Sequence, residues 1–189
     1  MFPRYFNLIV KLLLLMVLST AAQAEDQPGV GGDFTLTNTD STPFHLSDIR
    51  GEVAVLFFGF THCPDVCPNT LYEIKRLLVS LGDQADQVKV LFVSVDTERD
   101  TPEILSDYVA YFDSRMIGLT GSKAEIDSLL NKYHAKASVT KIAGDYHVEH
   151  SANLFLINRQ GALVSIVLPR TPFSVLQQQV KKLITESTR

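Results

Sequence analysis

Two cysteines, Cys63 and Cys67, are the only thiols of the chain, and they stand four positions apart in Cys63-Pro-Asp-Val-Cys67. On a helix, positions i and i+4 share one face with Cβ atoms ~5–6 Å apart, so both sulfurs can face one point. Such a pair suits a soft metal ion or a reversible disulfide. As a structural disulfide it would close a loop of a few residues and constrain the unfolded chain only weakly. We therefore expect a chemical role, as metal ligands or as a redox pair.

Two thiolates rarely complete a metal site, so a third ligand is expected among the histidines. The chain has five of them: His45, His62, His134, His147 and His150. His150 is best placed, because it directly precedes a predicted strand at a sheet edge that can face the cysteine loop. Alternation along residues 146–150 puts it on the same face as Tyr146 and Val148. The alternative is an ordinary loop histidine, and His62 is expected to have a structural or supporting role.

Strands and helices alternate along the chain. Predicted strands cover 34–37, 44–46, 53–58, 88–95, 116–119, 152–157 and 163–168, and predicted helices run from the cysteine motif to Gly82 and over 102–112, 122–133 and 173–184. The run 53–58 is apolar throughout, as in a strand buried on both faces, and it leads into the cysteine motif. The order predicts one α/β domain with a thioredoxin-like fold: a central mixed β-sheet flanked by helices, with an N-terminal β-hairpin.

The cysteine motif lies between a buried strand and a helix N-terminus, which is where ligands bind in open α/β sheets. Because a helix start favours negative charge, we expect a lowered thiol pKa there. After the strand 88–95, Asp100 or Thr101 can cap the helix that begins at Pro102, and we expect Asp100 to have a capping role.

The first 24 residues have the composition of a targeting signal. Arg4 and Lys11 are basic, residues 12–18 are apolar, and Ala22-Gln23-Ala24 is a small-x-small cleavage site. The predicted divisions are a signal peptide at 1–24, a linker at 25–32 and a folded domain at 33–189. An uncleaved membrane anchor is the alternative, although Lys11 leaves the apolar run short of the ~20 residues that span a bilayer. Both interpretations place the domain outside the cytoplasm.

Composition narrows the classes of partner. Hydrophobic residues make up 46% of the chain and charged residues 20%, as expected for a folded globular protein. The net charge is −4 at pH 7. No basic run interleaved with aromatic residues is found, so we expect no nucleic-acid partner.

Three segments resemble the Sco/SenC family: 57–68 (FFGFTHCPDVCP), 93–103 (VSVDTERDTPE) and 146–151 (YHVEHS). The resemblance implies a thioredoxin fold in the periplasm or at the extracytoplasmic face of the inner membrane, with membrane association through an uncleaved N-terminal segment as an alternative. It implies delivery of copper to cytochrome c oxidase subunit II or another copper-site apoprotein, with a further copper chaperone as another partner. The implied ligands of Cu(I) or Cu(II) are Cys63, Cys67 and His150.

The sequence departs from the family pattern at two positions. Glu149 stands where the family usually has Asp, and Thr97 where it usually has Pro. We expect that Glu149 can still orient His150 as a supporting carboxylate. Asp96 and Asp100 are candidates for a loop that docks a partner.

The main rival interpretation is a thiol–disulfide oxidoreductase that uses Cys63 and Cys67 to reduce a copper-site apoprotein. Redox thioredoxins have Cys-x-x-Cys and a Pro just before the strand that faces the disulfide. Here the cysteine spacing is one residue longer, and residues 149–151 (Glu-His-Ser) stand in that place. A His in place of the thioredoxin Pro favours metal binding, while Cys63 and Cys67 can still exchange thiols and disulfides. Residues 60–64 faintly resemble the motif of peroxiredoxins, which are peroxidases. The Pro that stands three residues before the Thr in those proteins is absent, because Phe58 occupies that position.

Overall fold

The structure is a computed structural model that describes residues 30–142 and 145–186. The predicted signal peptide, 1–24, and most of the predicted linker, 25–32, lie outside the described residues. Within the part that is described, no helix is long and apolar enough to cross a membrane.

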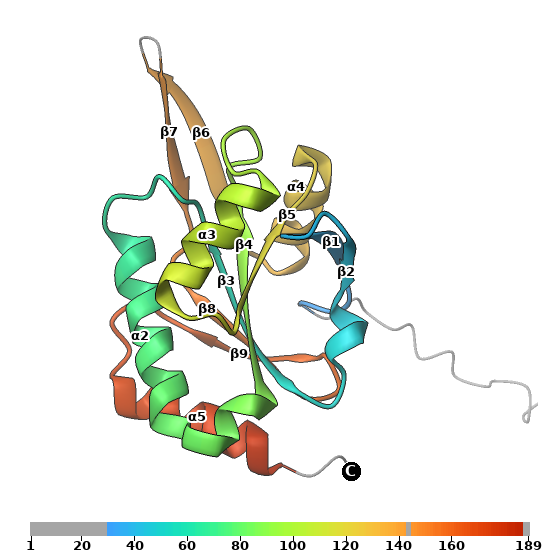
Figure 1. Cartoon of the computed structure of the whole chain (residues 1–189), viewed down its shortest axis with the longest axis vertical. Helices are drawn as coiled ribbons and strands as arrows, with labels where there is room; N and C mark the ends of the chain where they lie inside the picture. The colour runs from blue at the N-terminus through green and yellow to red at the C-terminus, as the bar shows by residue number, and fades with distance from the viewer. Residues whose placement is uncertain (1–29, 143–144, 187–189) are drawn as a thin grey trace, which may run out of the picture.

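A seven-stranded mixed sheet forms the centre of the domain, in the order β2-β1-β5-β4-β3-β8-β9 (Figure 1). Its strands are β1 (Thr35–Asn38), β2 (Pro43–His45), β3 (Val53–Gly59), β4 (Val88–Ser94), β5 (Met116–Thr120), β8 (Leu154–Ile157) and β9 (Leu163–Val167). The helices are α2 (Val66–Leu81), α3 (Pro102–Phe112), α4 (Lys123–Lys132) and α5 (Phe173–Thr185), with 3-10 turns η2 (Leu46–Ile49) and η3 (Gly82–Gln87). β3, β4 and β5 run parallel, whereas β8 pairs antiparallel with β3. The expected thioredoxin-like architecture is confirmed.

Strand β3 is buried along its whole length, as its apolar run predicted. Val55 and Phe57 belong to the core cluster shared with α2, α3 and α5. Leu56 and Phe58 belong to the cluster on the opposite face, which includes residues of α4 and η2. Because successive side chains of a strand point to opposite faces, this one strand packs against both helical layers. Its carboxyl end, Gly59, is therefore held firmly from both sides.

The helix ends follow recognisable signals, with one correction. Gly82 adopts φ 56° directly after α2, a conformation that glycine accepts without strain. The side chain of Thr101 caps α3 by accepting from the backbone N–H of Ile104. The expectation that Asp100 has a capping role is wrong, because its carboxylate instead accepts hydrogen bonds from Thr61 and from a β4 side chain.

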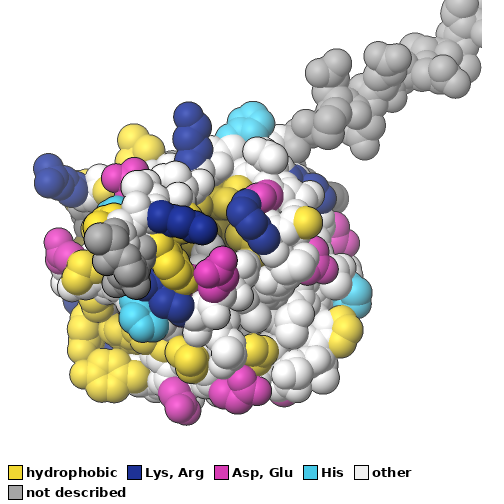
Figure 2. All heavy atoms as spheres, turned by 90° about the horizontal axis from the view of Figure 1, so that it is seen from above, with side chains coloured by type: hydrophobic (Ala, Val, Ile, Leu, Met, Phe, Trp, Pro, Cys, Tyr) yellow, Lys and Arg dark blue, Asp and Glu magenta, His cyan; other side chains and the backbone are white. Residues whose placement is uncertain are grey.

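A second, two-stranded sheet was not predicted. β6 (Ala137–Ile142) and β7 (Asp145–His150) form an antiparallel hairpin that rises beyond the main sheet (Figure 1). β6 is almost wholly exposed, so it has no buried face to produce an alternating pattern. The predicted alternation in residues 146–150 is confirmed: Val148 is buried while His147 and Glu149 are exposed. Seen from above, this end of the molecule carries basic, acidic and hydrophobic side chains intermixed (Figure 2).

The described end of the predicted linker contacts the domain. Gly31 N–H donates to the backbone oxygen of Lys132 at 2.8 Å, and Tyr133 Oη donates to the backbone oxygen of Gly32 at 3.0 Å. Gly31 has φ 90°, and a Cβ there would lie 2.5 Å from the Cβ of Leu163. Residues 31 and 32 are therefore held against α4 and β9.

Candidate metal centre

The cysteines lie where β3 passes into α2. The loop leaves the sheet after Gly59, whose backbone oxygen still accepts from Val95 N–H at 2.9 Å. Cys67 is in the first turn of α2 and is fully buried, while Cys63 is half-buried in the preceding loop. The backbone N–H of Cys67 donates to the sulfur of Cys63 at 3.4 Å. Both sulfurs therefore sit at the helix start, as the motif predicted.

The absence of a side chain at position 59 makes room for one of these sulfurs. A Cβ at Gly59 would lie 2.8 Å from Cys67 Sγ and 2.5 Å from the ring of Phe92. The φ angle of Gly59 is not positive, so the requirement for glycine is one of space and not of backbone conformation. The end of β3 is thus shaped around the sulfur.

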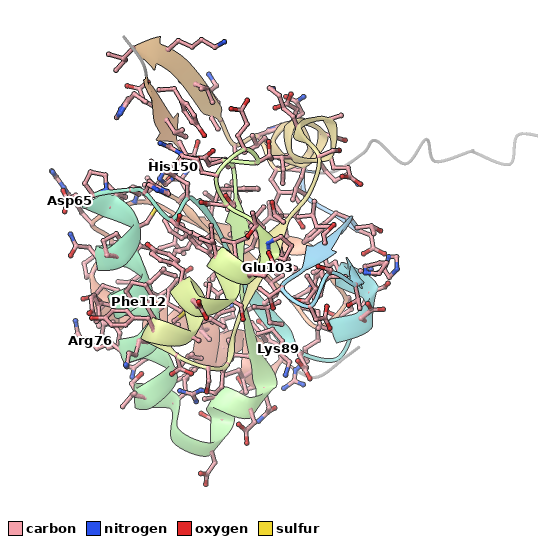
Figure 3. The ribbon with its side chains drawn as sticks, turned by 45° about the horizontal axis from the view of Figure 1, so that its top comes forward. Asp65, Arg76, Lys89, Glu103, Phe112 and His150 are labelled. Atoms are coloured by element: carbon pink, nitrogen blue, oxygen red, sulfur yellow. The ribbon has the colours of Figure 1, made fainter. Side chains whose placement is uncertain are left out.

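His150 ends strand β7 and reaches the cysteines from the hairpin (Figure 3). Its Nε2 lies 3.3 Å from Cys67 Sγ. Its Nδ1 lies 3.0 Å from the backbone oxygen of Ser151, which assigns the proton to Nδ1 and leaves the Nε2 lone pair for the sulfur side. Phe57 and Phe60 contact the imidazole edge-on, with ring centroids 5.9 Å and 5.7 Å away. The ring is therefore fixed both by a hydrogen bond and by packing.

The potential ligand atoms of Cys63, Cys67 and His150 all lie within 4.8 Å of one another. Two sulfurs and one imidazole nitrogen are a donor set for a soft or borderline metal ion. The structure thus brings together the three residues that were expected to act jointly. Among the remaining histidines, His45 hydrogen-bonds Thr35 and His62 lies in a second cluster.

Burial shifts the pKa values of Cys67 and His150. It raises the pKa of the Cys67 thiol well above its usual range, and the charge of a Cys63 thiolate adds to the rise. The expectation of a lowered pKa is therefore wrong for Cys67, because desolvation outweighs the favourable helix start. Burial also lowers the pKa of His150, so the imidazole is neutral. A metal ion that binds here must displace the thiol proton.

Glu149 does not orient the imidazole. It lies on the opposite, exposed side of β7, and its carboxylate is 3.5 Å from Ser138 Oγ across the hairpin. The backbone oxygen of Ser151 takes that place beside Nδ1 of His150. The expected supporting role for Glu149 is therefore wrong, because alternation along the strand directs its side chain away from its neighbour's.

A buried acidic network joins the cysteine loop to the hairpin. Asp100 accepts from Thr61 N–H at 2.9 Å and from Thr61 Oγ1 at 2.6 Å. Asp96 accepts from Tyr146 Oη at 2.6 Å and pairs with Arg99, whose guanidinium lies over the Tyr146 ring. Ser94 hydroxyl bonds Asp100 and accepts from the backbone N–H of Asp96. Sequence analysis noted both acids only as docking or capping candidates. Their 2% exposure is a tertiary property that a loop sequence does not reveal.

Comparison with known proteins gives a consistent match. The SCO1/SenC family model matches residues 22–185. The mitochondrial protein SCO2 of Saccharomyces cerevisiae is 36% identical over 149 residues, which are 76% of this chain and 49% of the yeast protein. The chain thus spans about half the length of that relative.

Solved structures resemble the domain closely. The structure of Bradyrhizobium japonicum ScoI with copper bound has a TM-score of 0.75 at 36% identity, covering 82% of this chain and 99% of that one. BsSco is a member of the Sco family of cytochrome c oxidase assembly proteins in which a disulfide switch was identified. It has a TM-score of 0.67 at 28% identity, covering 85% of this chain and 97% of its own.

Proposed function

The chain belongs to the SCO1/SenC family, and on that premise we propose that it is an exported copper-binding protein that delivers copper to cytochrome c oxidase subunit II during assembly of the oxidase. Cys63, Cys67 and His150 bind the metal. The observation that carries the proposal is the convergence of their ligand atoms within 4.8 Å. The likeness to copper-bound ScoI and to an oxidase assembly protein supports the choice of metal and of pathway.

The donor set suits copper in both oxidation states. Two thiolates favour Cu(I), and the added imidazole lets the same residues hold Cu(II). By ligand type alone a Cys₂His set also suits zinc, so the choice of copper rests on the similarity to a copper-bound protein. Cys63 is the half-exposed sulfur, so a client with its own ligands approaches from that side. The client is subunit II or another copper-site apoprotein, and a further copper chaperone is a candidate donor.

Export remains part of the proposal on the strength of the leader sequence. Cleavage after Ala24 would release a chain that begins at Glu25, in the periplasm or at the extracytoplasmic face of the inner membrane. The mass of the intact protein recovered from the cell envelope tests this. A chain that retains Met1 in the membrane fraction would instead support the uncleaved anchor.

A second candidate function is thiol–disulfide exchange on a copper-site apoprotein. Two observations favour it: Cys63 and Cys67 are free thiols four positions apart at the start of α2, and a disulfide switch was identified in BsSco. A reductase needs the dithiol alone, so His150 would be dispensable to it. A copper-delivery protein needs the third ligand to hold Cu(II) and to exchange ligands stepwise. The two functions therefore predict different outcomes for a substitution of His150.

The deciding experiment is rescue of oxidase activity in cells that lack the protein, grown with scarce copper. His150→Ala should fail to restore the oxidase while leaving reduction of a client peptide largely intact. His147→Ala is the matched control, because it removes an exposed imidazole from the same strand. Full rescue by His150→Ala, together with no rescue by Cys63→Ser or Cys67→Ser, would replace copper delivery with thiol exchange as the function.

A further inference from the structure

A buried hydroxyl without a partner lies on helix α3. The Oη of Tyr108 is buried and has no hydrogen-bond partner among the described residues. Buried polar groups in native proteins are nearly always hydrogen-bonded, and leaving one unpaired costs free energy. The hydroxyl is therefore available as a donor to a group that becomes an acceptor in another state of the protein.

Tyr108 belongs to the packing around Cys67. Its ring contacts Phe92, with centroids 5.5 Å apart. A Cβ atom added to Gly59 would lie within 3 Å of both the Phe92 ring and the Cys67 sulfur, so these two groups lie next to each other beside Gly59. Tyr108 packs on the core cluster that contains Cys67 and that Cys63 also borders. Phe92 therefore links the tyrosine to the buried sulfur of Cys67 within one core cluster.

The charged groups that act on the Tyr108 hydroxyl agree with this packing. After burial itself, the groups that raise its pKa are Cys67, then Cys63, then Asp100. Asp100 already accepts from Thr61 N–H and Thr61 Oγ1, and from the hydroxyl of Ser94 at 2.5 Å. The two sulfurs are also acceptors, and unlike Asp100 they lie in or against the core cluster on which Tyr108 packs. A neutral thiol accepts weakly, whereas a thiolate accepts strongly because it carries charge.

We propose that Tyr108 is a positioning residue for the metal-bound state, in which its hydroxyl donates a hydrogen bond to the thiolate sulfur of Cys67. The inference rests on the proposed function, because copper is what replaces the thiol proton. The bond would compensate part of the desolvation of a buried thiolate. It would also draw electron density from the sulfur and so raise the energy of sulfur-to-Cu(II) charge transfer.

The test compares Tyr108→Phe with wild type, and Tyr111→Phe is the matched control. Tyr111 is on the same helix but 72% exposed, and its hydroxyl meets that of Tyr72 at 3.5 Å. In the metal-free protein, Tyr108→Phe should melt at the wild-type temperature or above it, because the lost hydroxyl had no partner. When both proteins are loaded with copper, Tyr108→Phe should melt at a lower temperature than wild type. Cu(I) affinity, measured by competition with a chromophoric chelator, should fall about tenfold.

The Cu(II) spectrum supplies a readout that a merely structural role would not move. The thiolate charge-transfer band should shift to longer wavelength in Tyr108→Phe and stay in place in Tyr111→Phe. Unchanged affinity and band position would overturn the inference, and so would an equal loss of stability with and without copper. A wild-type protein that binds no copper would overturn the proposed function as well, whereas copper binding that is unchanged by Tyr108→Phe would overturn this inference alone.

Discussion

The two sides of the metal centre are built from different kinds of structure. The cysteine side is the loop and the first turn of α2 that follow β3, a strand with every residue buried between two helical layers. The histidine side is the end of β7, in a two-stranded sheet whose other strand, β6, is almost wholly exposed. Two of the proposed ligands thus follow the most confined strand of the domain, and the third comes from a projecting hairpin.

Under the proposed function, this difference separates the residues that hold the metal from the residue that releases it. Regions with few buried apolar contacts open at a lower free energy than the core. The hairpin can therefore withdraw its imidazole while the sulfurs stay in place. The contact between Tyr146 and Asp96 ties the hairpin to the loop after β4 and opposes that withdrawal. Changes on each side should accordingly have different consequences.

Loss of a core ligand should have the largest effect. Cys67→Ser should abolish stoichiometric copper binding and the thiolate charge-transfer band, because one remaining thiolate and an imidazole are a poor set for Cu(I). Metal content after gel filtration and the absorption spectrum measure this. Circular dichroism should show a retained fold. A variant that bound one copper per chain with an unchanged band would disprove the assignment of Cys67.

Loss of the hairpin ligand should have the next largest effect, and the size of that effect should depend on the oxidation state of copper. His150→Ala should weaken Cu(II) binding by at least ~100-fold, the upper end of what supporting residues contribute. Cu(I) should suffer less, because two thiolates alone can hold it linearly. Competition titrations in each oxidation state measure the difference. Equal losses for the two ions would mean that both sides of the centre contribute alike.

Crowding the core side should have a smaller effect on copper and a clear one on stability. The new methyl group of Gly59→Ala would lie 2.8 Å from Cys67 Sγ and 2.5 Å from Phe92. Overpacking of this kind costs ~1–3 kcal/mol in the free energy of unfolding, and the displaced sulfur should weaken copper binding. Denaturant unfolding and a chelator titration measure both. Val139→Ala, at an exposed position of β6, is the control that should change neither.

Loosening the tie between the two sides should have the smallest effect. Tyr146→Phe removes the hydrogen bond to Asp96, which contributes ~1 kcal/mol net. Amide hydrogen exchange should speed up in β6 and β7 while β3 and β4 keep their protection. Tyr72→Phe, on the surface of α2, is the control. Uniform acceleration across the main sheet would show that the hairpin and the core open together.

Features that depend on a short stretch of sequence could be predicted. The apolar run of β3 and the spacing of the cysteines each depend on local sequence, so both were predictable. The hairpin was missed because β6 has no buried face, and its partner β7 was recognised only as an alternating segment. The predicted lowering of the Cys67 pKa was wrong, because burial in the tertiary structure outweighs the effect of the helix start. The unpaired hydroxyl of Tyr108 is likewise a product of packing, which helical spacing alone does not reveal.

The contact between Cys67 and His150 spans 83 positions of the chain. If the chain is exported as proposed, with its N-terminus emerging first, both thiols leave the membrane pore long before the imidazole follows. Until the later strands have emerged and closed onto the sheet, the chain can offer a metal ion the two sulfurs without the imidazole of His150. The full ligand set exists only in the finished domain, so a metal ion that requires all three ligands stabilises the folded chain over the unfolded one. Under the proposed function, copper loading is in this sense a record that folding of the domain has been completed.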